Sequence, residues 1–385
     1  MSKRKICVVV TARPTYARVK SALAAILAHP DLELQLVAAA SALLERYGRV
    51  VDVMRRDGFT IAAEAQMVLE DSRPLTQAKT TGLGMIELAS VFERLRPDIV
   101  VTVADRYETL ATAAAASYGN IPLAHLQGGE ITGSIDEKVR HAITKLADLH
   151  FTSTQAAAER VIRMGERADR VWWTGCPSID LAVPVHEAPA LDFDPIAAYG
   201  GVGAPLDLSQ GYLVCLQHPV TTEADAAGSQ IAETVAAVQA VGLPVLWFWP
   251  NVDAGSDEAA KVLRRAREEG TENIHWFRNM EPDHFLRLIV NSRCLIGNSS
   301  VAIREGAFLG VPAVNIGTRQ QNRERGPNVI DVPPARAAIA DAIRAQCRHG
   351  RYESDATYGD GQAGARIADL LADAPLEIEK QLTYG

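Results

Sequence analysis

The segment HLQGGEITGSIDEKVRH holds the densest group of side chains in the sequence that could transfer protons. It places the carboxylates Glu130, Asp136 and Glu137 between the imidazoles of His125 and His141. Its glycines let the backbone approach a ligand closely. Because carboxylates and imidazoles are common general acids and bases, this segment predicts a proton-transfer site.

Ordinary helix signals explain part of the same segment. Ser134 and Glu137 have the spacing of a capping box, in which Glu137 would only bind a backbone N–H group. Asp136 and Arg140 are four residues apart and would form a simple ion pair on a helix. We favour a functional site because so many titratable groups lie between glycines.

Two more clusters follow predicted strands in the first half of the chain. Asp105 and Arg106 place a carboxylate beside a guanidinium, although Asp105 would equally serve as a helix cap. Arg13 precedes Pro14, which favours the start of a helix whose free N–H groups, together with Arg13, would hold phosphate. The alternative for Arg13 is a solvent-facing position on a loop.

The second half of the chain carries candidate phosphate-binding residues. In the motif IGNSS, Ser299 and Ser300 precede a predicted helix that carries Glu305. Hydroxyl and N–H groups there would hold a diphosphate, and Glu305 would accept hydrogen bonds from a ribose. A serine helix cap is the alternative. His218 and Arg319 follow two other predicted strands, where each would contact a phosphate.

Alternating strands and helices would position these residues. Short β-branched runs alternate with longer amphipathic segments along the 385 residues, which is typical of parallel strands joined by crossover helices. Prolines and glycines interrupt residues 181–211 and predict a linker there. We expect two doubly wound, Rossmann-like α/β domains facing a central cleft, at residues 1–180 and 212–362, and a helix at 363–385. Ligands bind beyond the carboxyl ends of parallel strands, where the candidate residues lie.

The composition excludes several classes of protein. The 48% hydrophobic and 22% charged residues are typical of a soluble globular protein. A net charge of -8 argues against a broad nucleic-acid or membrane surface, and no apolar run reaches the ~18 residues needed to span a bilayer. The five scattered cysteines argue against a disulfide framework or a zinc site. We therefore expect a cytoplasmic protein.

Taken in order, the motifs resemble those of the UDP-N-acetylglucosamine 2-epimerase family, in particular its hydrolysing branch, which serves pathways to sialic- and legionaminic-acid-type sugars. The resemblance runs through nearly the whole chain. The motifs that carry it are DRYE at 105–108, HLQGGEITGSIDEKVRHAITKLADLH at 125–150, GCPSID at 175–180, QHPVTTE at 217–223, NVDAGS at 251–256, IGNSS at 296–300 and IGTRQ at 316–320. No G-x-G-x-x-G or Walker motif competes with this interpretation.

The resemblance implies the two-domain fold of GT-B glycosyltransferases, with the nucleotide held mostly by the C-terminal domain. It implies a catalytic cluster, to which we assign Asp105, Glu130, Asp136 and Glu137, with His125 nearby. The proposed substrate- and nucleotide-binding residues are Arg13, Arg106, Gln127, His218, Asn251, Asp253, Ser299, Ser300, Glu305 and Arg319. The implied reaction is elimination of the nucleotide to a glycal, followed by addition of water, and it requires no metal or redox cofactor.

Three positions depart from the pattern of the family. Ala104 stands where many members have glycine, and Thr15 stands where an acidic residue is common. Gln127 stands where well-known hydrolysing members have glutamate. Because a neutral amide cannot accept a proton, either Glu130 or Asp136 takes the role of the base, or the substrate and rate differ.

The sequence thus predicts a hydrolysing nucleotide-sugar 2-epimerase. It would convert UDP-N-acetylglucosamine, or a 4-acetamido-6-deoxy relative, to the free 2-epimeric sugar and UDP. The Arg13-Pro14 pair is similar to the non-hydrolysing branch. A GT-B glycosyltransferase and a weakly active nucleotide-sugar sensor are the alternatives. We expect a nucleotide sugar as partner, no nucleic acid or membrane, and a homo-oligomer.

Overall fold

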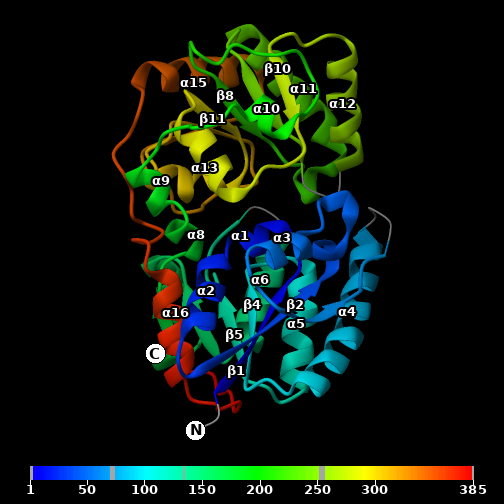
Figure 1. Ribbon diagram of the computed structural model, residues 1–385, viewed down its shortest axis with the longest axis vertical. Coiled ribbons are helices and arrows are strands. Elements are labelled where there is room, and N and C mark those ends of the chain that lie inside the picture. The colour runs from blue at the N-terminus through cyan, green and yellow to red at the C-terminus, as the bar shows by residue number, and fades with distance from the viewer. Residues whose placement is uncertain (1–2, 70–73, 133–134, 251–255, 384–385) are drawn as a thin grey trace. The chain divides into compact units, whose positions relative to one another are not determined.

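The computed structural model describes residues 3–69, 74–132, 135–250 and 256–383 (Figure 1). They form two compact units. Unit 1 consists of Met1–Glu130, Asp136–Asp180 and Tyr358–Gly385, and unit 2 consists of Ile131–Ile135 and Leu181–Thr357. The final segment of the chain therefore belongs to the same unit as the first.

Unit 1 is built on a parallel sheet, seven-stranded over the described residues, with the order β3-β2-β1-β4-β5-β6-β7. The strands are β1 (Arg4–Val10), β2 (Leu32–Ala39), β3 (Ile61–Ala65), β4 (Ile99–Val103), β5 (Leu123–Leu126), β6 (Leu149–Thr152) and β7 (Val171–Trp173). The helices are α1 (Arg13–Ala17), α2 (Lys20–Ala28), α3 (Val50–Arg56), α4 (Pro74–Leu95), α5 (Tyr107–Tyr118), α6 (Asp136–Leu146), α7 (Gln155–Arg163), α8 (Pro177–Asp180) and α16 (Ala363–Asp373).

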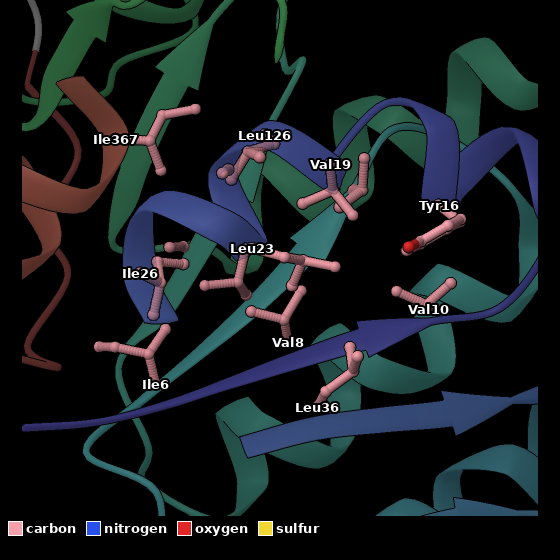
Figure 2. Packing of buried hydrophobic residues seen from close by; sticks show 14 of the residues in the cluster. Ile6, Val8, Val10, Tyr16, Val19, Leu23, Ile26, Leu36, Leu126 and Ile367 are labelled. Carbon is pink, nitrogen blue, oxygen red and sulfur yellow. The ribbon is translucent and has the colours of Figure 1, made fainter. Parts of the chain in front are cut away.

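Strand β1 is apolar on both sides because helices cover both faces of a parallel sheet. Ile6 and Val8 pack with Leu23 of α2 on one face (Figure 2), whereas Cys7 belongs to the cluster that α4 and α5 form on the other. Ile367 of α16 joins the first cluster, and α16 lies beside α2 (Figure 1). The last described helix thus completes the core around the first strand.

Unit 2 contains a second parallel sheet, six-stranded over the described residues, with the order β10-β9-β8-β11-β12-β13. Its strands are β8 (Leu213–Leu216), β9 (Val245–Phe248), β10 (Ile274–Phe277), β11 (Cys294–Gly297), β12 (Ala313–Ile316) and β13 (Val329–Val332). Its helices are α9 (Val183–Glu187), α10 (Pro195–Tyr199), α11 (Ala227–Val241), α12 (Ser256–Glu268), α13 (Pro282–Val290), α14 (Glu305–Phe308) and α15 (Arg336–His349).

Two segments differ from the sequence-based expectation. Residues 181–211, expected as a linker, contain α9 and α10 and group with unit 2. The helix expected at 363–385 ends at Asp373, because Pro375 disfavours a helical conformation at Ala374. None of the helices in the described part of the chain combines the length and the hydropathy that crossing a bilayer requires.

Candidate functional site

The candidate proton-transfer groups of unit 1 follow β4 and β5, which are neighbours in the sheet with Val103 opposite Leu126. Immediately after them, Ala104 and Gln127 both have a left-handed backbone with φ of 65°. This conformation is uncommon for residues with a side chain. The sharp turn at each strand end leads directly into the two predicted motifs.

Arg140 of α6 joins both strand ends. Its side chain is only 1% exposed, and Nη2 donates to Oδ2 of Asp105. Nη1 donates to the backbone oxygen of Glu130 at 2.7 Å and to Oε2 of Glu137 at 3.3 Å. Burial alone would lower the pKa of Arg140, but the carboxylates of Asp105, Glu130 and Glu137 raise it. The site therefore contains a permanently charged guanidinium among carboxylates.

Glu137 is shared between Arg140 and His141. Its Oε1 lies 3.0 Å from Nε2 of His141, while its other oxygen faces Arg140. Asp136 and Glu137 both lie in the first turn of α6, where the helix dipole favours negative charge. Ser134, the residue that would complete a capping box, lies outside the described residues. The structure thus places Glu137 in the charged cluster with Arg140.

His125, which we placed with the catalytic cluster, contacts the scaffold through both ring nitrogens in the structure. Its Nε2 lies 2.8 Å from the backbone oxygen of Ala104, and its Nδ1 lies 3.2 Å from Oγ1 of Thr144. A carbonyl only accepts, so Nε2 donates and Nδ1 accepts from the hydroxyl. Complete burial lowers the pKa of His125 to about 3. The ring is therefore neutral and fixes the turn at Ala104, with both nitrogens used by the scaffold.

Gln127, which we assigned to substrate binding, lies almost fully buried. Its Nε2 donates to Sγ of Cys176 at 3.2 Å, and that sulfur lies 3.0 Å from Oγ of Ser178. Cys176 and Ser178 belong to the GCPSID motif, whose individual residues we did not assign to the site. The motif itself was the available signal, because it follows a predicted strand.

The two arginines predicted in unit 1 differ in their surroundings. Arg106 contacts both carboxylate oxygens of Glu108 through Nε, at 3.2 and 3.1 Å, and Glu108 is 1% exposed. Arg13 is half-buried at the start of α1, where Pro14 occupies the first turn as the sequence predicts. Arg106 thus has a buried carboxylate beside it.

Asn298 is the centre of the polar cluster in unit 2. It follows β11, which pairs with β8, and it contacts His218 at the end of β8. The backbone oxygen of Asn298 accepts from Nη1 of Arg319 at 3.1 Å and from Nε2 of Gln320 at 2.9 Å. Asn298 thus brings together His218 and Arg319, two of the predicted binding residues, from separate strand ends.

The other candidate residues of this motif, Ser299 and Glu305, follow Asn298 along the chain. Oγ of Ser299 accepts from the backbone N–H of Val301, so the predicted helix cap is present. Oε2 of Glu305, at the start of α14, is buried and has no hydrogen-bond partner among the described residues. A buried acceptor of this kind is suited to a ligand hydroxyl. Asn251 and Asp253 lie outside the described residues.

Comparisons with known proteins identify the family of this chain. The profile of a family described as UDP-N-acetylglucosamine 2-epimerase matches residues 24–372. A UDP-N,N'-diacetylbacillosamine 2-epimerase (hydrolyzing) of Legionella pneumophila is 32% identical over 376 residues, covering 98% of this chain and 97% of that protein. A UDP-N-acetylglucosamine 2-epimerase of Neisseria meningitidis is 29% identical and covers 96% and 95% of the two chains.

Solved structures show the same fold. UDP-GlcNAc 2-epimerase of Methanocaldococcus jannaschii, in complex with UDP-GlcNAc and UDP, has a TM-score of 0.80 at 16% identity, over 95% of this chain and 99% of that one. The Neisseria meningitidis enzyme bound to UDP-GlcNAc has a TM-score of 0.78 at 17% identity, over 95% and 99%. The predicted fold class, two Rossmann-like α/β domains of GT-B type, is confirmed.

Proposed function

We propose that this chain, which belongs to the UDP-N-acetylglucosamine 2-epimerase family, is a hydrolysing nucleotide-sugar 2-epimerase. It would convert UDP-N-acetylglucosamine, or a 4-acetamido-6-deoxy relative, to the free 2-epimeric sugar and UDP. The observation that carries the proposal is the group of carboxylates around Arg140 at the ends of β4 and β5. The Legionella relative, named as a hydrolysing enzyme, supports the choice of branch.

The proposed reaction begins with removal of the proton on carbon 2 of the sugar as the nucleotide leaves. A carboxylate near the weakly acidic C–H bond is needed for this step. We assign the step to the cluster of Asp105, Glu130, Asp136 and Glu137. Gln127 cannot be the base, because an amide does not accept a proton at neutral pH. Water then adds to carbon 1 of the glycal, and carbon 2 is protonated on the opposite face.

We assign the nucleotide to unit 2. The guanidinium of Arg319 and the hydroxyls of Ser299 and Ser300 would bind the diphosphate, with His218 beside them. The unpartnered Oε2 of Glu305 would accept from a ribose hydroxyl. Stabilisation of the departing diphosphate by these groups would lower the barrier to elimination. Arg13, Arg106, Asn251 and Asp253 stay in the proposed binding set as predictions from the sequence.

Product analysis in heavy water tests the proposal. The purified protein is incubated with UDP-N-acetylglucosamine and with related UDP sugars, and the products are followed by NMR. A free 2-epimeric sugar carrying deuterium at carbon 2, together with UDP, is the expected result. Absence of both products from every donor would contradict the proposal, and turnover that needs an acceptor would favour a glycosyltransferase. Tight UDP binding without turnover would favour a sensor.

The remaining expectations concern assembly and location. We propose a cytoplasmic homo-oligomer that has no nucleic-acid or membrane partner, as the charge and composition indicate. Light scattering on the purified protein measures its mass in solution. A mass equal to the 41.5 kDa of one chain would contradict the oligomer.

A further inference from the structure

We propose that Arg140 is a positioning residue, which acts on catalysis by holding the Asp105 carboxylate in place. This inference rests on the proposed function. The spacing of Arg140 and Asp136 along the helix suggests only a local ion pair. In the structure, the guanidinium reaches a carboxylate 35 positions away in the sequence.

The guanidinium of Arg140 contacts three separate parts of the cluster. Nη2 bonds to Asp105 in the turn after β4, and Nη1 bonds to the backbone oxygen of Glu130 in the loop after β5. Nη1 also reaches Glu137 on α6 itself. A planar guanidinium has donors that point in several fixed directions, which a lysine ammonium on its flexible chain does not have. Arg140 thus fixes the relative positions of groups that the proposed proton transfer uses.

The charge of Arg140 is as important as its shape. Asp105 is 8% exposed, and burying a carboxylate is costly unless a cation pairs with it, as Arg140 does here. The other acidic groups that face Arg140 are Glu130 and Glu137, and His141 faces Glu137 from the next turn. Arg140 therefore offsets the mutual repulsion of the carboxylates while it orients Asp105.

A purely structural role for Arg140 gives different expectations. If Arg140 only stabilised α6, its replacement would lower stability without acting specifically on the chemical step. If it acts through Asp105, its replacement slows proton transfer but leaves nucleotide binding in unit 2 intact. The replacement of Arg140 also has little further effect on kcat once Asp105 has been replaced, because the effects of substituting two interacting residues do not add.

The experiment compares Arg140→Lys, Arg140→Met, Asp105→Asn and the double variants, with UDP-N-acetylglucosamine or the best donor from the panel. We expect Arg140→Lys to lower kcat on the order of 10²-fold. KM and the Kd for UDP should change by less than about threefold, since the proposed nucleotide contacts are untouched. A substrate deuterated at carbon 2 should show a larger isotope effect than with the wild type, because C–H cleavage becomes slower.

In the Asp105→Asn background, Arg140→Lys should lower kcat by less than about threefold further. Two results would overturn the inference. One is a double variant whose loss of kcat is the product of the two single losses, and the other is a kcat within threefold of wild type for Arg140→Lys. If the Arg140→Met variant does not fold, the double variant with Arg140→Met and Asp105→Asn takes its place in the comparison. That double variant removes both buried charges.

Lys138 provides the matched control. It is exposed on the same helix, so Lys138→Met should leave kcat, KM and the melting temperature unchanged. Wild-type turnover in the same assay distinguishes failure of the proposed function from failure of the proposed role of Arg140. Absence of turnover with every donor would overturn the proposed function and this inference together, whereas turnover with independent effects of the two substitutions would overturn only the role of Arg140.

Discussion

Asn298 holds the backbone of His218 through a reciprocal pair of hydrogen bonds. The N–H of His218 donates to Oδ1 of Asn298, and Nδ2 of Asn298 donates to the oxygen of His218, both at 2.8 Å. Both residues are buried, at 2% and 5% exposure, so water cannot easily replace these bonds. The side-chain amide of Asn298 therefore fixes the end of β8 relative to the end of β11.

We expect Asn298→Ala to weaken UDP binding by about tenfold, because two net hydrogen bonds are worth roughly 1–3 kcal/mol and part of this appears as displacement of His218. Isothermal titration calorimetry with UDP measures the effect. Asn291→Ala is the control: this exposed amide bonds to the oxygens of Pro189 and Arg287, and its loss should not change the Kd. Equal affinities for wild type and Asn298→Ala would contradict the role.

Asp105→Asn and Asp136→Asn should each lower kcat on the order of 10²-fold or more, since each replaces a carboxylate of the proposed proton-transfer cluster by an amide. The Kd for UDP should stay within about threefold of wild type, because neither carboxylate belongs to the proposed nucleotide-binding set. Steady-state kinetics and calorimetry on the same preparations give both quantities. Unchanged turnover in both variants would refute their assignment to the site.

His125 predicts a loss of stability on mild acidification. Burial lowers the pKa of His125 to about 3, whereas in the unfolded chain it stays near the ordinary 6.5. Between these values the unfolded state binds the extra proton, so the free energy of unfolding falls as pH falls below 6.5. From pH 7 to pH 5 this single group removes about 2 kcal/mol.

Urea unfolding at pH 7 and pH 5 measures this contribution. The His125→Gln variant keeps an N–H donor for the oxygen of Ala104 but has no titratable ring. Its free energy of unfolding should therefore fall by about 2 kcal/mol less between pH 7 and pH 5 than that of the wild type. His150, whose pKa burial also lowers, remains in both proteins and cancels in the comparison. Equal pH dependence in both would show that His125 is not a buried neutral ring.

Gly129 should not tolerate a side chain. Its φ is 74°, and a β-carbon there would lie 2.3 Å from the backbone oxygen of Ala157 and 2.8 Å from Val161. We expect Gly129→Ala to lower the free energy of unfolding by more than about 2 kcal/mol, from overpacking and backbone strain together. Gly82→Ala, on α4 with nothing within 4 Å, should instead stabilise by about 0.5–1 kcal/mol. Urea unfolding of the two variants makes the comparison, and equal stabilities would contradict it.

Most of the fold was predictable because the strands form short, buried, β-branched runs. The two strands that were missed, β3 and β13, lie at sheet edges, where burial is partial and the signal is weak. β3 reads Ile-Ala-Ala-Glu-Ala, with little β-branched character. The two other edge strands, β7 and β10, were predicted, because Val-Trp-Trp and Ile-His-Trp-Phe are rich in β-branched and aromatic residues.

The sequence indicates which residue types gather at the strand ends, but it does not indicate the contacts that each of them makes. The motif around His125 indicated proton transfer, but the burial that keeps the ring neutral and the contacts with Ala104 and Thr144 come from the tertiary fold. In the same way, helical spacing suggests a pair of Arg140 with Asp136 but gives no sign of the bond to Asp105, which the fold creates. Sequence reasoning identifies residue types near strand ends, and only packing decides which of them face each other.

Because the chain returns to unit 1 at Tyr358, the two units can complete their folding at different times during synthesis. Ile367 packs in the same core as Ile6, so β1 is synthesised long before the helix α16 that completes its core. Unit 2, apart from residues 131–135, is contiguous and can close earlier. We expect nascent chains halted before residue 358 to hold a folded second unit and an unfinished first one, with the apolar face of α2 open to chaperones.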